Sequence, residues 1–223
     1  MKNDSIAYVL GFMLAVSVLF GTAVSLVHHG TKDMLARNEQ MHRNRTVAQA
    51  FGLEVEGRDA ADYEQAVAEH VHETMLKADG RTWPVFQHPR PESGQKPDAV
   101  GFEFMGQGVW DVIRGILVLT PELDRILSLR LLEQHETPGL GGRIEEDWFL
   151  QQFQNIIPNW DSPKDRRVII GQSLDPEAEN RVDAITGATQ TSQALMRMLN
   201  QELEAFRKAF MAYQAQAARQ DNG

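Results

Sequence analysis

The feature that most constrains this 223-residue chain is an apolar segment near its N-terminus. Residues Ile6 to Val27 include no charged side chain and are mostly Leu, Val, Ala, Phe and Met. A helix needs ~20 such residues to cross the ~30 Å hydrocarbon core of a bilayer. Gly11 and Gly21 fit this interpretation, because glycine is common in membrane helices. We therefore predict an N-terminal tail and transmembrane helix over residues 1–30.

Two other interpretations of the segment stay open. A cleaved signal peptide would have a shorter apolar region and a small-residue cleavage site, whereas this run ends in Val27-His28-His29. A buried core helix is rarely so uniformly apolar at a chain end. Basic residues flank the segment on both sides, at Lys2 and at Lys32 and Arg37, so they do not decide its orientation. Our default expectation is a short tail inside and the domain outside.

The composition excludes several classes of function. Hydrophobic residues at 42% and charged residues at 24% are ordinary for a folded domain. The net charge is −9 and no long Lys/Arg run occurs, so we expect no nucleic-acid partner. The chain has no cysteine, which excludes disulfides, thiolate zinc sites and iron–sulfur ligation by thiolates. Any redox chemistry must therefore come from a bound cofactor.

The remaining pattern predicts an α+β domain with a mainly antiparallel sheet and flanking helices. We expect a helical stalk and the N-terminal part of the soluble domain over residues 31–80, the main domain over residues 81–212 and a polar tail over residues 213–223. An exposed loop is expected at Pro89–Pro97 and a turn at Gly106–Gly108. Helices are predicted at Thr31–Glu54, Asp59–Lys77, Glu145–Gln154 and Gln193–Gln216, and strands at Thr82–Gln87, Ala99–Met105, Gly115–Leu119, Ile126–Glu133 and Val168–Ile170.

A first motif, Asp183–Ser192 (DAITGATQTS), places several hydroxyl groups beside small residues where a helix is predicted to begin, near Ser192. Backbone N–H groups at a helix start lack intrahelical acceptors and favour a phosphate. Gly187 and Ala188 would let that phosphate approach the backbone. Alternatively, Thr191 or Ser192 is simply the N-cap of the helix, which is a common role for a hydroxyl.

A second motif, His135–Gly142 (HETPGLGG), follows a predicted strand. Pro138 and Gly139 favour a tight turn, and three glycines in four positions favour a flat or bulky group lying against the backbone. His135 and Glu136 could donate protons or bind a metal, but one His beside one Glu does not make a metal site, and we predict none. An exposed hairpin loop is the alternative.

A third motif, Gly106–Asp111 (GQGVWD), has a tryptophan two residues after a glycine-rich turn. Trp110 could stack on a planar ligand or belong to the hydrophobic core.

The three motifs together are more informative than each alone. Gly-x-Gly-x-Trp, HETPGLG and D-x-x-TGAT-x-TS, in this order, resemble the periplasmic FMN-binding domain shared by two membrane redox complexes. One is the sodium-translocating NADH:quinone reductase, through its C subunit, and the other is the Rnf ferredoxin:NAD oxidoreductase, through its G subunit. The resemblance covers Ile6–Val27 and, more specifically, the chain from Val85 to the helix after Ser192.

The resemblance implies that FMN is joined by a phosphoester to Thr189, the last threonine of the TGAT motif. Asp183 would belong to the sequence read by the magnesium-dependent FAD:protein FMN transferase that installs the group. Thr189 would be an attachment point, and no catalytic residue is expected. The other expected cofactor-binding residues lie in the three motifs: Trp110, Glu136, Thr137, Leu140, Gly141, Ile185, Thr186, Gly187 and Ala188.

The resemblance also implies an electron-transfer subunit of a redox-driven ion pump, in the bacterial inner membrane with its domain facing the periplasm. It would take one electron from a membrane-embedded iron–sulfur centre and pass it to another flavin. Its partners would be the other membrane subunits, the transferase and membrane lipid. Gly115 and Gly142 favour the NADH:quinone reductase branch, whereas His135 is more typical of the Rnf branch. A membrane-anchored binding module without flavin and a stand-alone flavinylated carrier are further alternatives.

Overall fold

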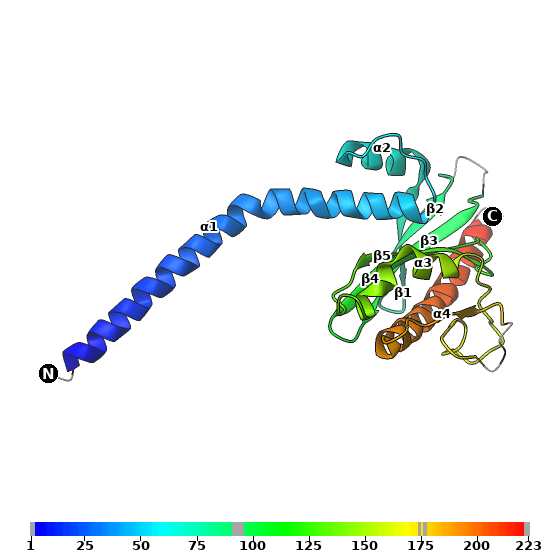
Figure 1. The fold of residues 1–223 in the computed structure, drawn as a ribbon. Helices are drawn as coiled ribbons and strands as arrows, with labels where there is room; N and C mark the ends of the chain where they lie inside the picture. The colour runs from blue at the N-terminus through cyan, green and yellow to red at the C-terminus, as the bar shows by residue number, and fades with distance from the viewer. Residues whose placement is uncertain (1–2, 91–95, 174, 176–177, 221–223) are drawn as a thin grey trace. The chain divides into compact units, whose positions relative to one another are not determined.

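The computed structural model describes residues 3–90, 96–173, 175 and 178–220. Contacts divide the chain into two compact units, Met1–His42 and Arg43–Gly223. Helix α1 (Asn3–Ala50) begins in the first unit and ends in the second, and is drawn from blue to cyan in Figure 1. Within the described residues, α1 is the helix that is long and apolar enough to cross a membrane. The candidate membrane-spanning part of α1 begins at Ile6. The predicted stalk helix is thus continuous with the apolar segment, and it ends at Ala50 instead of Glu54.

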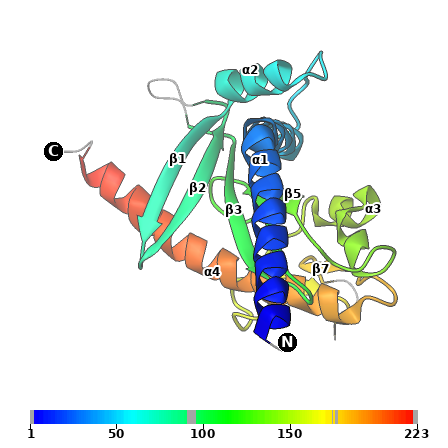
Figure 2. The same cartoon turned by 90° about the vertical axis from the view of Figure 1, so that its left-hand side faces the viewer.

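An antiparallel sheet of five strands forms the centre of the second unit, in the order β1-β2-β3-β4-β5. Figure 2 shows β1, β2 and β3 side by side, with helix α4 running across them. The predicted α+β fold with a mainly antiparallel sheet is confirmed. The strands are β1 (His72–Ala78), β2 (Arg81–His88), β3 (Ala99–Gln107), β4 (Val112–Leu119) and β5 (Ile126–Glu133).

The prediction of a helix over Asp59–Lys77 is wrong for the residues after His70. Helix α2 covers only Ala60–His70, and the following residues form strand β1. A two-residue turn, Asp79-Gly80, joins Ala78 to its partner Arg81, and both turn residues have positive φ, of 49° and 74°. An Asp-Gly pair is a strong hairpin signal because both central residues of a type I′ turn need positive φ. Pairing with β2 therefore overrides the helical spacing of the apolar residues in this stretch.

Other boundaries also differ from the predicted ones. The helix expected at Glu145–Gln154 consists of one α-helical turn, Asp147–Leu150, followed by a 3-10 turn, Gln151–Phe153. Strand β3 extends into the turn expected at Gly106–Gly108. The loop expected at Pro89–Pro97 lies partly outside the described residues. The remaining elements are η1 (Gly141–Glu145), α3 (Asp147–Leu150), η2 (Gln151–Phe153), the parallel pair β6 (Ile169–Ile170) and β7 (Arg181–Val182), and α4 (Thr189–Gln220).

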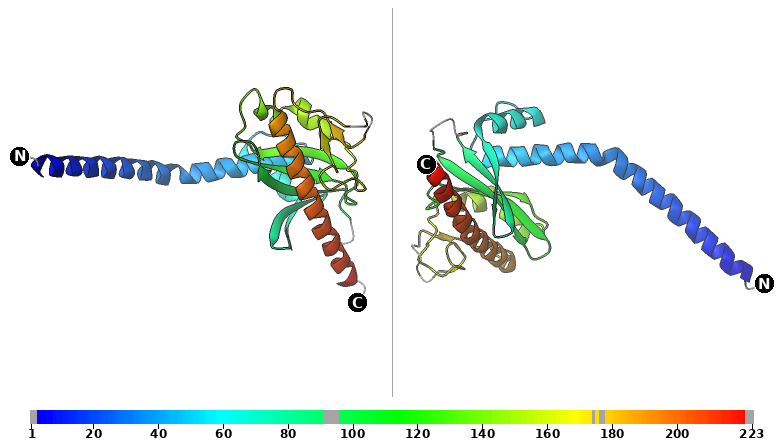
Figure 3. Two further views of the ribbon diagram at one scale, coloured as in Figure 1. Left: turned by 90° about the horizontal axis from the view of Figure 1, so that it is seen from below. Right: turned by 180° about the vertical axis from the view of Figure 1, so that it is seen from behind.

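Helix α4 packs its apolar stripe on one face of the sheet and forms the larger core with it. The stripe contributes Leu195, Leu199, Leu203 and Phe206, all buried. Phe102 on β3 stacks on Phe206, with ring centroids 4.0 Å apart and planes inclined by 13°. Both views in Figure 3 show α4 running alongside the sheet. This packing fixes the direction of α4 and therefore the position of its first turn.

The opposite face of the sheet carries a smaller core made by the end of α1 and by α2. Val47, Ala48 and Val67 pack there against Phe86 and Ile116. Both sheet faces are therefore covered by helices within the second unit.

The end of α1 is also held to the sheet by charge. The Arg43 guanidinium forms ion pairs with Glu73 at 2.5 Å and with Glu103 at 3.0 Å. Burial of the guanidinium lowers its pKa and the two carboxylates raise it, and the net result is a raised pKa for Arg43. The partners lie on β1 and β3, so this arginine joins the helix to two strands of the sheet.

We predict that Phe206→Ala lowers the free energy of unfolding by about 3–5 kcal/mol, because it removes a fully buried aromatic ring from the α4 interface. Urea unfolding of the full chain in detergent, followed by tryptophan fluorescence, measures this loss. Met211→Ala is the matched control, since Met211 lies on the same helix but is exposed, and its effect should stay within about 0.5 kcal/mol. Equal effects of the two substitutions would contradict this account of the core.

Candidate functional site

Helix α4 begins at Thr189, earlier than the sequence pattern predicted. Its first helical hydrogen bond runs from the backbone N–H of Ser192 to the carbonyl of Ala188, at 3.0 Å. The first N–H groups of a helix have no intrahelical acceptor, and Ala188 has no polar side chain to cap them. The alternative that Thr191 or Ser192 is the N-cap is therefore wrong, because both residues lie inside the helix. This helix start can accept an anion.

The three threonines of this segment have different environments. Thr186 and Thr189 are exposed, whereas Thr191 is only 5% exposed. The Thr191 hydroxyl donates a 2.6 Å hydrogen bond to Oε2 of Glu136. Thr186 and Thr189 are thus accessible from solution, whereas the Thr191 hydroxyl is hydrogen-bonded inside the protein.

Glu136 links the three sequence motifs. Its side chain is 4% exposed, and its Oε1 accepts hydrogen bonds from the backbone N–H groups of Val109, at 2.8 Å, and Trp110, at 3.2 Å. Its Oε2 accepts the Thr191 hydroxyl. The carboxylate therefore joins the β3–β4 turn, the loop after β5 and the first turn of α4, which are far apart in the sequence.

Two glycines make room for this carboxylate. A Cβ atom on Gly108 would lie 2.5 Å from Oε1 of Glu136, and one on Gly141 would lie 2.5 Å from Oγ1 of Thr191. Distances this short are not possible without displacing the buried pair. The close approach of the Glu136–Thr191 pair thus explains why Gly108 and Gly141 are glycines.

The loops that meet at this buried pair also carry exposed apolar side chains. Trp110 is 71% exposed and Leu140 is 47% exposed. The indole N–H of Trp110 donates to the Thr137 hydroxyl at 2.9 Å, so its ring is held by the neighbour of Glu136. Trp110 is therefore not a core tryptophan, and its exposed ring is available to a ligand or a partner.

The loop before α4 is fixed from both sides. Asp183 is exposed, pairs with the Arg181 guanidinium at 2.6 Å and donates its backbone N–H to Gln152 at 2.9 Å. The buried Ile185 donates its backbone N–H to the Ser192 hydroxyl at 3.3 Å. Gly187 has φ +82°, and a Cβ atom there would touch the Leu140 side chain at 3.4 Å. The TGAT segment and the ETPGLG loop are therefore neighbours.

Two pairs of ionisable side chains lie in or beside the same loops. Nδ1 of His135 lies 3.8 Å from a carboxylate oxygen of Asp111, and both residues are exposed. The Trp148 indole N–H and the Arg143 guanidinium hold the pKa of the Glu146 carboxyl below its usual value. Glu146 also forms an ion pair with Arg143 at 3.2 Å.

The structure brings together the motif residues that the sequence singled out, and it adds two that sequence reasoning missed. The sequence indicates only a possible helix cap for Thr191, and it does not predict that Gly108 leaves space for Glu136. A signal for Thr191 exists in the sequence, because Thr191 and Leu195 are four residues apart on the buried stripe of α4. A hydroxyl on a buried stripe needs an acceptor.

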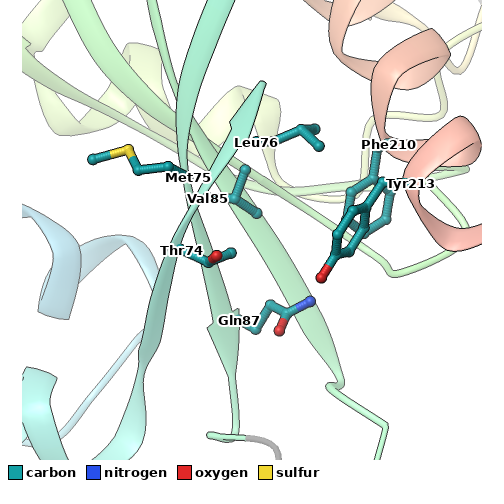
Figure 4. Close-up of a pocket in the computed structure, with 7 residues that line it drawn as sticks. All are labelled: Thr74, Met75, Leu76, Val85, Gln87, Phe210 and Tyr213. Atoms are coloured by element: carbon teal, nitrogen blue, oxygen red, sulfur yellow. The ribbon is translucent and has the colours of Figure 1, made fainter. Parts of the chain in front are cut away.

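A separate small pocket lies at the other end of α4 (Figure 4). Its cavity of about 10 Å³ could hold no more than a water molecule. Phe210 and Tyr213 line it, and they lie about six helical turns beyond Thr189, roughly 30 Å away. This pocket therefore plays no part in the site at the start of α4.

We predict that Gly141→Ala destabilises the fold by about 1–3 kcal/mol, because the added methyl group collides with the Thr191 hydroxyl and Cβ of Glu136. The free energy of urea unfolding measures the effect. Gly142→Ala is the matched control in the same loop, where the new Cβ would have only ordinary contacts of 3.4 Å or more. A tolerated Gly141→Ala would mean that the Glu136–Thr191 pair is not tightly enclosed.

Comparison with known proteins agrees with this geometry. Residues 108–204 match the FMN-binding domain family, and this range contains all three loops joined by Glu136. The C subunit of the Na(+)-translocating NADH-quinone reductase of Pasteurella multocida is 30% identical over 47% of this chain, an alignment that spans only 39% of that protein. The corresponding protein of Vibrio campbellii is 21% identical over 87% of this chain and 89% of its own length.

Solved structures share the fold. The crystal structure of Shewanella oneidensis NqrC superposes with a TM-score of 0.66 at 19% identity, covering 80% of this chain and 99% of that one. The equivalent protein from Parabacteroides distasonis gives a TM-score of 0.63 at 19% identity, covering 80% and 96%. The chain is thus similar to C subunits of Na(+)-translocating NADH-quinone reductase, and its residues 108–204 match the FMN-binding domain family.

Proposed function

We propose that this chain is the covalently flavinylated electron-transfer subunit of a membrane-bound, sodium-translocating NADH:quinone reductase. FMN is attached through its phosphate to Thr189, and the domain faces the extracytoplasmic side of the bacterial inner membrane. The observation that carries this proposal is an exposed threonine hydroxyl on the first residue of α4, in the same loop cluster as the exposed ring of Trp110.

Thr189 fits the attachment role better than the two neighbouring threonines. Thr191 is buried and bonded to Glu136, so it cannot react with a bulky group from solution. Thr186 is exposed but lies before the helix start. Only Thr189 combines an exposed hydroxyl with a place in the first turn of α4, where backbone N–H groups stabilise the negative charge of a phosphate.

The attachment chemistry requires a single substitution at phosphorus. The Thr189 oxygen forms a phosphoester bond to the FMN phosphorus of FAD, the pyrophosphate bond breaks, and AMP leaves with the bridging oxygen. The hydroxyl proton is released to a base of the FMN transferase or to solvent. Asp183 lies six residues before Thr189, exposed and next to Arg181, where the transferase can reach it.

The residues around Thr189 fit a flavin. Trp110 and Leu140 offer exposed apolar surface to an aromatic ring system, and Thr137 and Glu136 fix the backbone on which they stand. Gly187 and Ala188 leave space near the phosphate. When bound, FMN supplies one- and two-electron redox chemistry, and a phosphoester leaves its ring system unsubstituted. The contacts of Trp110 and the ETPGLG loop then tune its potential.

The anchoring helix and the relatives support the assignment to a membrane complex. The apolar part of α1 has the length and composition of a membrane span, and the relatives are named as subunits of a Na(+)-translocating NADH-quinone reductase. The partners we propose are the other membrane subunits, the FMN transferase and the surrounding lipid. A covalent bond keeps the cofactor with a domain that faces an open compartment, where a dissociated flavin would be lost.

We predict that Thr189→Val removes all covalently bound flavin, because valine keeps the shape of threonine but lacks the reacting oxygen. The measurement is in-gel flavin fluorescence after denaturation of protein co-expressed with the FMN transferase. Thr82→Val, at an exposed threonine outside the three motifs, is the control and should keep its fluorescent band. A band that survives Thr189→Val would contradict the attachment site, and a wild-type chain without a band would favour a binding module that carries no flavin.

We predict that a chain beginning at Thr31 leaves the membrane fraction and remains yellow when co-expressed with the transferase. The deletion removes the apolar residues and retains the helical part that ends at Ala50. Ultracentrifugation of cell lysates, with flavin absorbance measured in both fractions, tests the prediction. Continued sedimentation of the shortened chain with the membranes would argue against a single anchor.

A further inference from the structure

We propose that Glu136 is a positioning residue for flavin attachment. Its buried carboxylate holds the first turn of α4 against the β3–β4 turn, so that the Thr189 hydroxyl and the Trp110 ring have a fixed relative position. The inference rests on the proposed function, since it concerns how the acceptor threonine is presented. The carboxylate acts through Thr191 and through two backbone N–H groups, not by touching the reacting atoms.

Three donors within the protein form hydrogen bonds with the carboxylate. Val109 and Trp110 donate to Oε1, and the Thr191 hydroxyl donates to Oε2 at 2.6 Å. Hydrogen bonds to an ionised acceptor are shorter and about twice as strong as neutral ones. With 4% of its surface exposed, Glu136 has little access to water, which makes each of these donors important.

The two segments that Glu136 joins carry the attachment threonine and the exposed tryptophan ring. Thr191 lies two residues after Thr189 in the first turn of α4. Trp110 receives support twice, since its backbone N–H donates to Glu136 and its indole N–H donates to Thr137. One side chain therefore determines how the attachment point and the exposed ring are placed relative to each other.

Close packing restricts the movement of the Glu136 and Thr191 side chains. Gly108 and Gly141 lie so near the pair that neither has room for a Cβ atom. The backbone N–H of Glu136 also donates to the Gln134 side chain at 2.8 Å, which fixes the start of the loop. An enclosed carboxylate with several donors favours one geometry, and small displacements of a reacting group cost large factors in rate.

The experiment measures the rate of flavin transfer from FAD to the purified full chain in detergent, with the FMN transferase and Mg²⁺. The variants are Glu136→Ala, Glu136→Gln, Thr191→Val and Thr191→Ser. Glu122→Gln is the control for a change at a carboxylate outside the site, because Glu122 is exposed in the turn between β4 and β5. Each rate is divided by the folded fraction, determined from near-UV circular dichroism, so that a loss of stability is not counted as a loss of positioning.

We expect transfer to slow by about 10-fold or more in Glu136→Ala and Thr191→Val at saturating FAD, by analogy with other losses of reactant orientation. Thr191→Ser keeps the hydroxyl and should restore the rate. Glu136→Gln keeps acceptors for both N–H groups and a partner for Thr191, so it should lie much closer to wild type than Glu136→Ala. The two disruptive substitutions should not be additive when combined, since they break the same contact.

Flavin already attached gives a second readout. The visible circular dichroism of the bound flavin should change in Thr191→Val and stay as in wild type in Thr191→Ser, because the signal depends on the surroundings of the ring. If Glu136→Ala does not fold, the Thr191 pair of variants carries the test alone.

The possible failures are distinguishable. Wild-type transfer rates in Glu136→Ala and Thr191→Val would overturn the positioning role while leaving the proposed function intact. A Glu136→Gln chain as slow as Glu136→Ala would also overturn it, because a required negative charge points to chemistry at the carboxylate and not to placement. A wild-type chain that acquires no covalent flavin would instead remove the proposed function itself.

Discussion

The site depends on one buried carboxylate. Glu136 accepts hydrogen bonds from three donors that belong to two other segments of the chain. Its carboxylate lies in the ETPGLG loop and forms hydrogen bonds with the β3–β4 turn and with the first turn of α4. Because an unpaired buried charge is strongly destabilising, the three segments are held together as a set.

The rest of the fold serves to bring those donors to the carboxylate. Phe206 and Phe102 fix α4 on the sheet, and the direction of the helix carries Thr191 to Glu136. The register of β3 with β4 sets where the turn with Trp110 emerges from the sheet. The packing of α4 on the sheet thus determines the geometry of the site. A substitution in the core that displaces α4 should therefore also displace Thr191 relative to Glu136.

The sequence was sufficient for most of the strands and for the positions of the motifs, but not for how the motifs interact. Alternating residues in Ile126–Glu133 predicted β5 with its observed ends, since periodicity is a local property. The second half of Asp59–Lys77 was misassigned, because its pairing with β2 is not local and helical spacing of the apolar residues was misleading. The start of α4 was placed too late for a related reason. Hydroxyl residues normally cap helices, whereas here Thr191 bonds Glu136, which lies 55 residues away.

The most direct test of the account is to locate the flavin within one peptide. Cleavage after Arg181 and Arg197 releases Val182–Arg197, which contains Thr186, Thr189 and Thr191. Tandem mass spectrometry of this peptide, from chain co-expressed with the transferase, identifies the modified side chain. The account predicts a phosphate-linked FMN on Thr189 with Thr186 and Thr191 unmodified. FMN on either of the other threonines, or an unmodified peptide from a yellow protein, would contradict it.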